Sequence, residues 1–282
     1  MEELKNIRNK TLSLLYIMDN ENDFKLYPVV DDEDVMKIDR EFNPVVQQPP
    51  FVKILLGTRG SGKTATLVNE IFRSNIYGDK KGKEPIFNDI IVFSSTLGCD
   101  STSRHLVKRA TTTHDSYDDV MVEQILNFQK DTEKKDRKHI LIICDDIAPI
   151  LKPTDAIFKL CSVHRHYLIS IYFLIQSPRL IPPIVRNCYT SMYIYRLPNR
   201  SEQEKVFVDL SFLGGKKAVE KMYNYCTNLP YQFMMVDALK NQVYKWGGCQ
   251  PELIWTKFNE QGGYNPPFEK ELPKSIMDDD SD

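Results

Sequence analysis

The stretch FVKILLGTRGSGKT, residues 51–64, decides the fold of this chain. An apolar run rich in β-forming residues leads directly into the pattern G-x-x-x-x-G-K-T at residues 57–64, which is the phosphate-binding P-loop. Its glycines permit the tight turn that aims successive backbone N–H groups at one anion. The apolar side chains that follow, Leu67, Ile71 and Phe72, have helical spacing, so the phosphates would lie at a positively polarised helix N-terminus. This order of strand, loop and helix predicts that the protein binds a nucleoside triphosphate.

Each part of the loop has an expected role toward the nucleotide. Lys63 would reach the β- and γ-phosphates, and the hydroxyl of Thr64 would bind Mg²⁺. ATP and Mg²⁺ are therefore the expected cofactors. The residues expected to hold the nucleotide are Gly57, Thr58, Arg59, Gly60, Ser61, Gly62, Lys63, Thr64 and Ala65.

A second motif, HILIICDD at residues 139–146, ends an apolar strand with two carboxylates. Ligands of open α/β sheets bind at the carboxyl ends of the strands, which is also where a P-loop opens. Asp145 fits the Walker-B role of holding Mg²⁺, and Asp146 would then polarise the water that attacks the γ-phosphate. The alternative is that the two aspartates only cap the following helix. That alternative is disfavoured because the P-loop needs a magnesium partner on a neighbouring strand.

Apolar runs of strand length recur along the chain with helical or loop stretches between them. Residues 116–129, for example, carry apolar side chains at a period close to 3.6. The alternation predicts an α/β fold, a P-loop NTPase of the additional-catalytic-acid type, with a mainly parallel central sheet, helices on both faces and a C-terminal β-hairpin. An inserted strand between the P-loop and Walker-B strands marks that type, and residues 89–95 are a candidate part of the arrangement. The predicted strands are residues 51–57, 89–95, 139–144, 167–175 and 189–195, and the hairpin spans 231–238 and 243–246.

The predicted domain organisation has three parts. Residues 1–48 are polar and acidic, end in QQPP and are expected to form an N-terminal extension. Residues 49–246 would form the ATPase core. Residues 247–282, dominated by Gly, Pro and charge and ending in MDDDSD, are expected to be an irregular C-terminal tail.

Two further side chains are candidates for catalysis. Gln176 emerges from an otherwise apolar strand, beside the two aspartates, and would orient the attacking water or sense the γ-phosphate; binding to local backbone is the alternative. Arg165 precedes the same strand, where it can face the nucleotide of a neighbouring subunit in a ring and neutralise charge on the transferred phosphoryl group. Ordinary salt bridging is the other interpretation of Arg165. The competing arginines are Arg59, Arg179 and Arg186.

Composition narrows the class of protein. The 282 residues are 41% hydrophobic and 27% charged, as in an ordinary soluble globular protein, and no apolar run approaches the ~20 residues of a membrane span. Six scattered cysteines without CxxC spacing argue against a disulfide framework. The N-terminal MEELKNIRNK has no hydrophobic signal region, so no signal peptide is expected. The net charge of −2 means that any nucleic-acid contact must come from a local patch or from a ring pore.

Taken together, the motifs GTRGSGKT, ILIICDDIA, HRHYLISIYFLIQS and IPPIVRNCYTSMYIYR resemble the FtsK–HerA superfamily, and within it the viral genome-packaging ATPases of the poxvirus and giant-virus or virophage type. The resemblance covers residues 51–246. It implies an oligomeric ring, a pentamer or hexamer, that hydrolyses ATP to move double-stranded DNA independently of its sequence into a preformed capsid. It also implies Lys63 and Thr64 as the Walker-A pair, Asp145 and Asp146 as the Walker-B pair, Gln176 as the polar sensor and Arg165 as the arginine before the sensor strand.

The resemblance extends to partners and location. A capsid vertex protein would be a further partner, and the protein would act in the host cytoplasm or viral factory or associate with the virion. Two alternatives stay open: a P-loop switch whose nucleotide state controls assembly, and a cellular FtsK/HerA-like DNA-transfer ATPase. A small-molecule kinase fits less well, because the paired aspartates and Gln176 suit water as the acceptor.

Overall fold

The computed structural model describes residues 12–18, 24–30, 38, 42–81, 83–97, 101–247, 250–259 and 262–268. The chain divides into two compact units, Met1–Arg40 and Glu41–Asp282. In the first unit, strands β1 (Leu12–Met18) and β2 (Phe24–Val30) form an antiparallel hairpin. Most of the predicted N-terminal extension and the acidic end MDDDSD lie outside the described residues.

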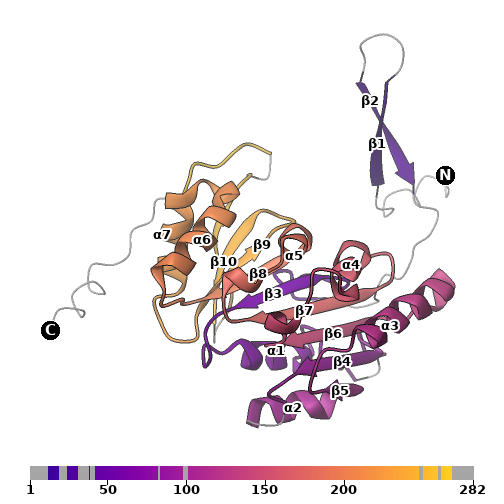
Figure 1. Ribbon diagram of the computed structural model, residues 1–282. Helices are drawn as coiled ribbons and strands as arrows, with labels where there is room; N and C mark the ends of the chain where they lie inside the picture. Colours follow the sequence, from indigo (N-terminus) through magenta and orange to yellow (C-terminus); the bar gives the residue numbers. More distant parts are fainter. Residues whose placement is uncertain are drawn as a thin grey trace. The chain divides into compact units, whose positions relative to one another are not determined.

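Within the described part of the second unit, nine strands form one sheet in the order β11-β10-β9-β8-β3-β7-β6-β4-β5 (Figure 1). Neighbouring strands from β8 to β5 are parallel, and β9, β10 and β11 extend the sheet in antiparallel fashion. The strands are β3 (Val52–Leu56), β4 (Asp89–Ser94), β5 (Thr112–His114), β6 (Ile140–Asp145), β7 (Ile169–Ile175), β8 (Ser191–Tyr195), β9 (Phe233–Asp237), β10 (Gln242–Trp246) and β11 (Glu252–Thr256).

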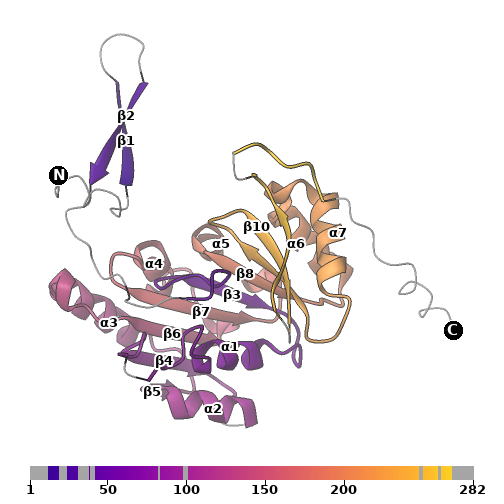
Figure 2. The same cartoon turned by 180° about the vertical axis from the view of Figure 1, so that it is seen from behind.

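Helices cover both faces of this sheet (Figures 1 and 2). Helices α1 and α2 contact each other on the face to which Lys53 of β3 points, whereas apolar side chains of α3 to α7 share one buried cluster with Val52 and Ile54. The helices are α1 (Lys63–Phe72), α2 (Ser101–Arg109), α3 (Asp119–Asp131), α4 (Ala156–Val163), α5 (Pro183–Cys188), α6 (Arg200–Asp209) and α7 (Lys216–Cys226). Short 3₁₀ turns are η2 (Lys134–Asp136), η3 (Ala148–Ile150), η4 (Pro178–Leu180) and η5 (Ser211–Leu213).

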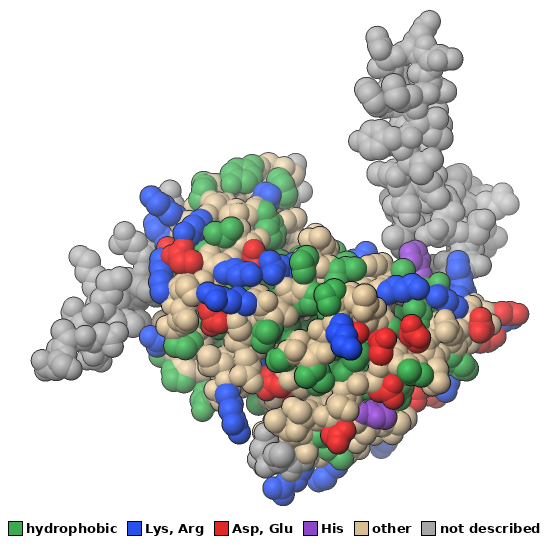
Figure 3. Space-filling view, viewed as in Figure 1, with side chains coloured by type: hydrophobic (Ala, Val, Ile, Leu, Met, Phe, Trp, Pro, Cys, Tyr) green, Lys and Arg blue, Asp and Glu red, His purple; other side chains and the backbone are tan. Residues whose placement is uncertain are grey.

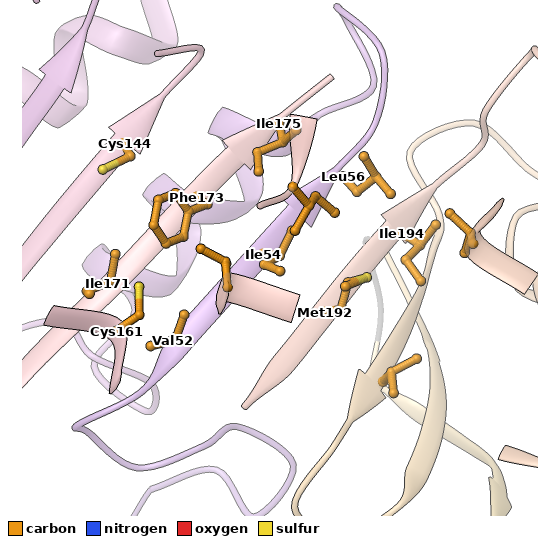
Figure 4. Packing of buried hydrophobic residues seen from close by; sticks show 14 of the residues in the cluster. Val52, Ile54, Leu56, Cys144, Cys161, Ile171, Phe173, Ile175, Met192 and Ile194 are labelled. Atoms are coloured by element: carbon orange, nitrogen blue, oxygen red, sulfur yellow. The ribbon is translucent and has the colours of Figure 1, made fainter. Parts of the chain in front are cut away.

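The central strands are buried along their whole length. All five residues of β3 and all seven of β7 are buried, which is why these strands read as nearly continuous apolar runs, interrupted only by Lys53 and Ser170. On the face covered by α3 to α7, alternate residues of β3 and β7 pack side by side (Figure 4). The labelled side chains Val52, Ile54 and Leu56 lie next to Ile171, Phe173 and Ile175. This packing fixes the strand that carries the P-loop against β7.

The opposite face of β3 buries a charge. Lys53 is fully buried, and its Nζ donates to Glu70 Oε2 of α1 at 3.0 Å and lies 4.7 Å from the ring centroids of both Phe51 and Tyr77. Tyr172 of β7 and Tyr193 of β8 also donate to the Glu70 carboxylate. Burial lowers the pKa of Lys53, and the Glu70 carboxylate opposes this shift. The network therefore ties the helix that follows the P-loop to three strands at once.

The predicted strands are present with ends shifted by one or two residues, and the α/β fold with its C-terminal hairpin, β9–β10, is confirmed. The suggestion that residues 89–95 contribute the inserted strand is wrong. The strand between the P-loop strand β3 and the Walker-B strand β6 is β7, and β4 lies on the far side of β6. Both β4 and β7 are apolar, so their sequences did not reveal which one is inserted.

The expected irregular tail is wrong for residues 252–256. These residues form β11, which pairs with β10 across a β-bulge, and the ring of Trp255 reaches the hydrophobic core. At the other end of the core, Val46 and Gln47 are buried, although both fall in the predicted extension. The boundaries 1–48, 49–246 and 247–282 stay a prediction of where the functional parts divide.

Candidate active site

The sheet topology brings the predicted motifs to one edge. Strands β3, β6, β7 and β8 are parallel, so the P-loop, Asp146, Gln176 and Arg196, which follow them, lie at the same carboxyl edge. Two backbone hydrogen bonds join these strand ends. Gly57 N–H donates to Ile175 O at 3.0 Å, and Asp146 N–H donates to Leu174 O at 3.2 Å. The end of β7 thus lies between the P-loop and the paired aspartates.

Two glycines of the loop are required by its geometry. A Cβ atom on Gly57 would lie 2.6 Å from Ser61 Oγ and 2.7 Å from Tyr195 Cβ, so any other residue would clash. Gly62 caps α1 in the left-handed region, with φ of 101°, where a side chain would be strained. No side chain caps the first turn of α1. The N–H groups at this helix end therefore point to where an anion would bind.

Lys63 begins α1 and folds back over the loop. Its Nζ donates to Gly57 O at 2.7 Å and to Thr58 O at 3.1 Å. Burial lowers the pKa of this ammonium, while the carboxylates of Asp146 and Asp145 oppose the shift. The lysine is thus close enough to both aspartates to interact with them electrostatically, as a group serving one phosphate chain should be.

The paired aspartates have different surroundings. Asp145 is the buried last residue of β6, and the hydroxyl of Ser94 donates to its Oδ2 at 3.4 Å. Asp146 follows with φ of 53°, a left-handed conformation that is uncommon outside glycine. Gln176 Nε2 donates to Asp146 Oδ2 at 2.8 Å. In the structure Gln176 therefore contacts the second aspartate. This contact does not support the alternative in which Gln176 binds local backbone.

The donors at this edge suit Mg²⁺. Carboxylate and hydroxyl oxygens are the ligands that this ion prefers, and Asp145, Thr64 and Ser94 supply them. Among the described residues, no group of three or more His, Cys, Asp or Glu side chains could hold a metal alone. When a nucleotide is bound, its phosphate oxygens would supply further ligands to the ion.

The arginine candidates fall in different places. Arg165 is exposed and precedes β7, at the amino edge of the parallel sheet, so it lies at the opposite edge from the P-loop of its own chain. Arg59 is exposed within the P-loop, and Arg179 follows β7 and donates to Ser201 Oγ at 3.1 Å. Arg186 on α5 donates to Ile181 O. The geometry brings Arg59 and Arg179, but not Arg165, to the nucleotide edge of the same subunit.

Two features of this edge were not predicted from the sequence. Ser94 was identifiable as a polar end to an apolar strand, but its contact with Asp145 depends on β4 lying beside β6. The second feature is a pocket of about 410 Å³ beside the P-loop. Its lining consists of residues 58–61 of the loop, Tyr195 at the end of β8, Arg196 and Pro198 after that strand, and residues 229–232 before β9. Because β9 is antiparallel to β8, its start lies at the carboxyl edge of the parallel strands. No local sequence pattern predicts that the start of β9 lies beside the P-loop.

None of the helices in the described part of the chain combines the length and apolar character that crossing a bilayer requires.

Two solved structures are similar in fold to this chain. Genome packaging NTPase B204 of Sulfolobus turreted icosahedral virus 2, in a complex with AMP, is 17% identical, with a TM-score of 0.52 over 70% of this chain and 96% of that one. The DNA-packaging ATPase B204 of Sulfolobus turreted icosahedral virus is 16% identical, with a TM-score of 0.50 over 70% of this chain and 97% of that one. At these identities the two structures show a shared fold. The search of curated proteins found no match.

The family of the Poxvirus A32 protein matches residues 39–245, which include the P-loop, both aspartates, Gln176 and Arg165. The resemblance inferred from the motifs is thereby confirmed, and the chain belongs to the Poxvirus A32 protein family.

Proposed function

We propose that this protein is an ATP-hydrolysing motor that translocates double-stranded DNA and packages a viral genome into a preformed capsid. The observation that carries the proposal is the hydrogen bond from Gln176 to Asp146 at the P-loop edge, in a chain of the Poxvirus A32 protein family. A carboxylate held in this way suits activation of a water molecule. A nucleotide switch does not require such a group.

The residues divide the chemistry among them. Lys63 and the loop N–H groups bind the phosphates, and Lys63 exchanges its present contacts with Gly57 O and Thr58 O for phosphate oxygens. Asp146 accepts a proton from the attacking water, and Gln176 orients the carboxylate or the water through its amide. Asp145 and Thr64 would hold Mg²⁺, which neutralises charge on the phosphates when it is bound.

In this proposal Arg165 acts across a subunit interface. Because this arginine lies at the opposite sheet edge from its own P-loop, a role in hydrolysis requires a second subunit whose nucleotide edge meets this amino edge. A ring, a pentamer or hexamer, repeats that contact at every interface. Arg59, exposed within the P-loop, is the competing candidate in the same subunit.

DNA binding would also depend on assembly. Basic and acidic side chains are interspersed on the face shown in Figure 3, in keeping with the net charge of −2. A single subunit therefore has no strong overall attraction for a polyanion, whereas a ring brings several copies of the same lysines and arginines to one pore. The partners in this proposal are duplex DNA of any sequence, other copies of the chain and a capsid vertex protein. The sites of action are the host cytoplasm or viral factory, or the virion.

The test measures ATP hydrolysis with and without linear duplex DNA while light scattering reports the oligomeric state. A translocase is expected to hydrolyse ATP faster when DNA is added to the assembled protein. An assembled protein whose rate does not change with DNA, but whose assembly changes with ATP or ADP, would favour the nucleotide switch. A cellular DNA-transfer motor would share the stimulation and would differ in lacking affinity for capsid components.

A further inference from the structure

The pocket beside the P-loop lies where the base of a nucleotide would extend. Phosphates bound at residues 57–64 leave two directions for the rest of the nucleotide along the sheet edge. Toward β7 and β6 the edge is occupied by Gln176 and the paired aspartates. Toward β8 and β9 it opens into the pocket of about 410 Å³, whose walls include the P-loop residues Thr58 and Ser61. A volume of this order accommodates a nucleoside.

The outer wall of this pocket is apolar and aromatic. It is formed by Pro198, Leu229, Pro230 and Tyr231. Leu229 and Tyr231 are 53% and 69% exposed, so two large apolar side chains face solvent next to the loop that binds phosphates. A flat, exposed aromatic ring beside a pocket is the kind of surface on which a nucleobase stacks.

The backbone of Tyr231 has an unusual conformation. Its φ is 63°, a left-handed conformation that costs a non-glycine residue free energy and persists when neighbouring contacts impose it. The backbone of Gly247 passes close to it, since a Cβ atom on Gly247 would lie 2.6 Å from Tyr231 O. The ring reaches the P-loop, since a Cβ atom on Gly62 would lie 3.3 Å from Tyr231 Cδ1. Tyr231 therefore stands at the junction of the phosphate loop and the pocket.

Two of the residues that line the pocket, Ser61 and Gln232, each have a side-chain oxygen that lacks a partner among the described residues. The oxygens Gln232 Oε1 and Ser61 Oγ are buried, and neither makes a hydrogen bond. A buried polar atom without a partner destabilises the folded state, so a ligand that completes its hydrogen bonds gains affinity. Ser61 lies in the phosphate loop and suits a phosphate oxygen. Gln232 follows Tyr231 and directly precedes β9, and its side-chain oxygen would accept from a donor on the base.

We propose that this pocket is the adenine subsite, in which Tyr231 stacks on the base and Gln232 accepts a hydrogen bond from its exocyclic amine. The inference deepens the function proposed above and rests on nucleotide binding at the P-loop. The loop contacts only phosphates, which all nucleotides share, so selection among bases must come from groups outside it. Tyr231 and Gln232 are specificity-determining residues in this arrangement.

The experiment measures binding by calorimetry of three probes: ADP, purine riboside 5′-diphosphate, which lacks the 6-amino group, and inorganic tripolyphosphate. Tyr231→Ala should weaken ADP binding on the order of 10-fold or more, the usual scale for loss of base stacking, while Tyr231→Phe should restore it. Tripolyphosphate should bind both variants as it binds the unaltered protein. Tyr264→Ala is the matched control, since Tyr264 is also exposed, at 56%, and pairs with Phe258 away from the loop.

Gln232→Leu provides the second readout. The unaltered protein should prefer ADP over purine riboside diphosphate, and this variant should bind the two diphosphates equally. If Tyr231→Ala and Gln232→Leu leave ADP affinity and the preference unchanged while tripolyphosphate still competes with ADP, the adenine subsite is wrong and the P-loop assignment stands. If neither ADP nor tripolyphosphate binds the unaltered protein, both proposals are overturned.

Discussion

Replacing Lys53 by methionine should lower the free energy of unfolding by about 3 kcal/mol, because it leaves the buried carboxylate of Glu70 without its counter-ion. Removing one partner of a buried ion pair typically costs about 3–5 kcal/mol. Here the lower end is expected, since Tyr172 and Tyr193 still donate hydrogen bonds to the same carboxylate. Methionine fills most of the volume of the lysine stem, so the loss would not come from a cavity.

The double variant Lys53→Met/Glu70→Gln separates charge from packing. Glutamine keeps one oxygen that accepts from one tyrosine hydroxyl, its NH₂ group can donate to the hydroxyl oxygen of the other, and no unpaired charge remains in the interior. The double variant should therefore lie within about 1–2 kcal/mol of the unaltered protein and be more stable than Lys53→Met alone. Lys159→Met, which removes an exposed lysine from α4, is the control and should change stability by less than about 0.5 kcal/mol.

Urea denaturation followed by tryptophan fluorescence and by circular dichroism would measure these differences. Trp246 lies 6.1 Å from Tyr193, centroid to centroid, so its emission reports on the network directly. The two signals must unfold together for the free energies to be compared. If Lys53→Met is as stable as the unaltered protein, or if the double variant is less stable than Lys53→Met alone, the ion pair between Lys53 and Glu70 does not stabilise the fold.

Four further outcomes are expected. Asp146→Asn should bind ATP but hydrolyse it about 10²-fold or more slowly, whereas Lys63→Ala should lose both binding and turnover; near-normal phosphate release by Asp146→Asn at saturating ATP contradicts the general-base assignment. Arg165→Ala should fold, bind ATP and hydrolyse poorly, and mixing it with Asp146→Asn should recover activity; mixed rings without activity exclude a role across the interface. Duplex binding should ignore sequence and weaken with salt, with a log–log slope of about 0.9 per phosphate contacted, and strong preference for one duplex argues against a translocase. Burial lowers the pKa of His139 and of His164, so the unfolded chain binds protons at these histidines more readily than the folded chain does. The free energy of unfolding should therefore fall as the pH drops below the ordinary histidine pKa of about 6.5, and equal urea midpoints at about pH 7.5 and about pH 5.5 would contradict this.

The local patterns of the chain were sufficient to predict the elements that carry the candidate site residues. The P-loop and the Walker-B strand each occupy one continuous stretch of sequence, and a tight turn and a buried strand each require particular residue types. The pattern therefore predicted that Lys63 and Thr64 begin a helix and that Asp145 and Asp146 lie at the end of a strand, as they do in the structure. Gln176 was predicted from a polar residue that ends an apolar strand. Its contact with Asp146 joins residues that the sequence already placed at one edge.

Local patterns along the chain thus predicted the elements and the ends of strands at which polar groups emerge. The tertiary structure decided which strands are neighbours, because β4 and β7 are both apolar on two faces and satisfy the same pattern. It alone placed β7 beside the P-loop strand, added β11 to the sheet and set the start of β9 next to the loop. The pairing of Lys53 with Glu70 and the pocket at Tyr231 depend on those choices. Strand order depends on how whole faces of the sheet pack against helices across the core. Because that packing joins residues far apart in the chain, a local sequence pattern does not predict it.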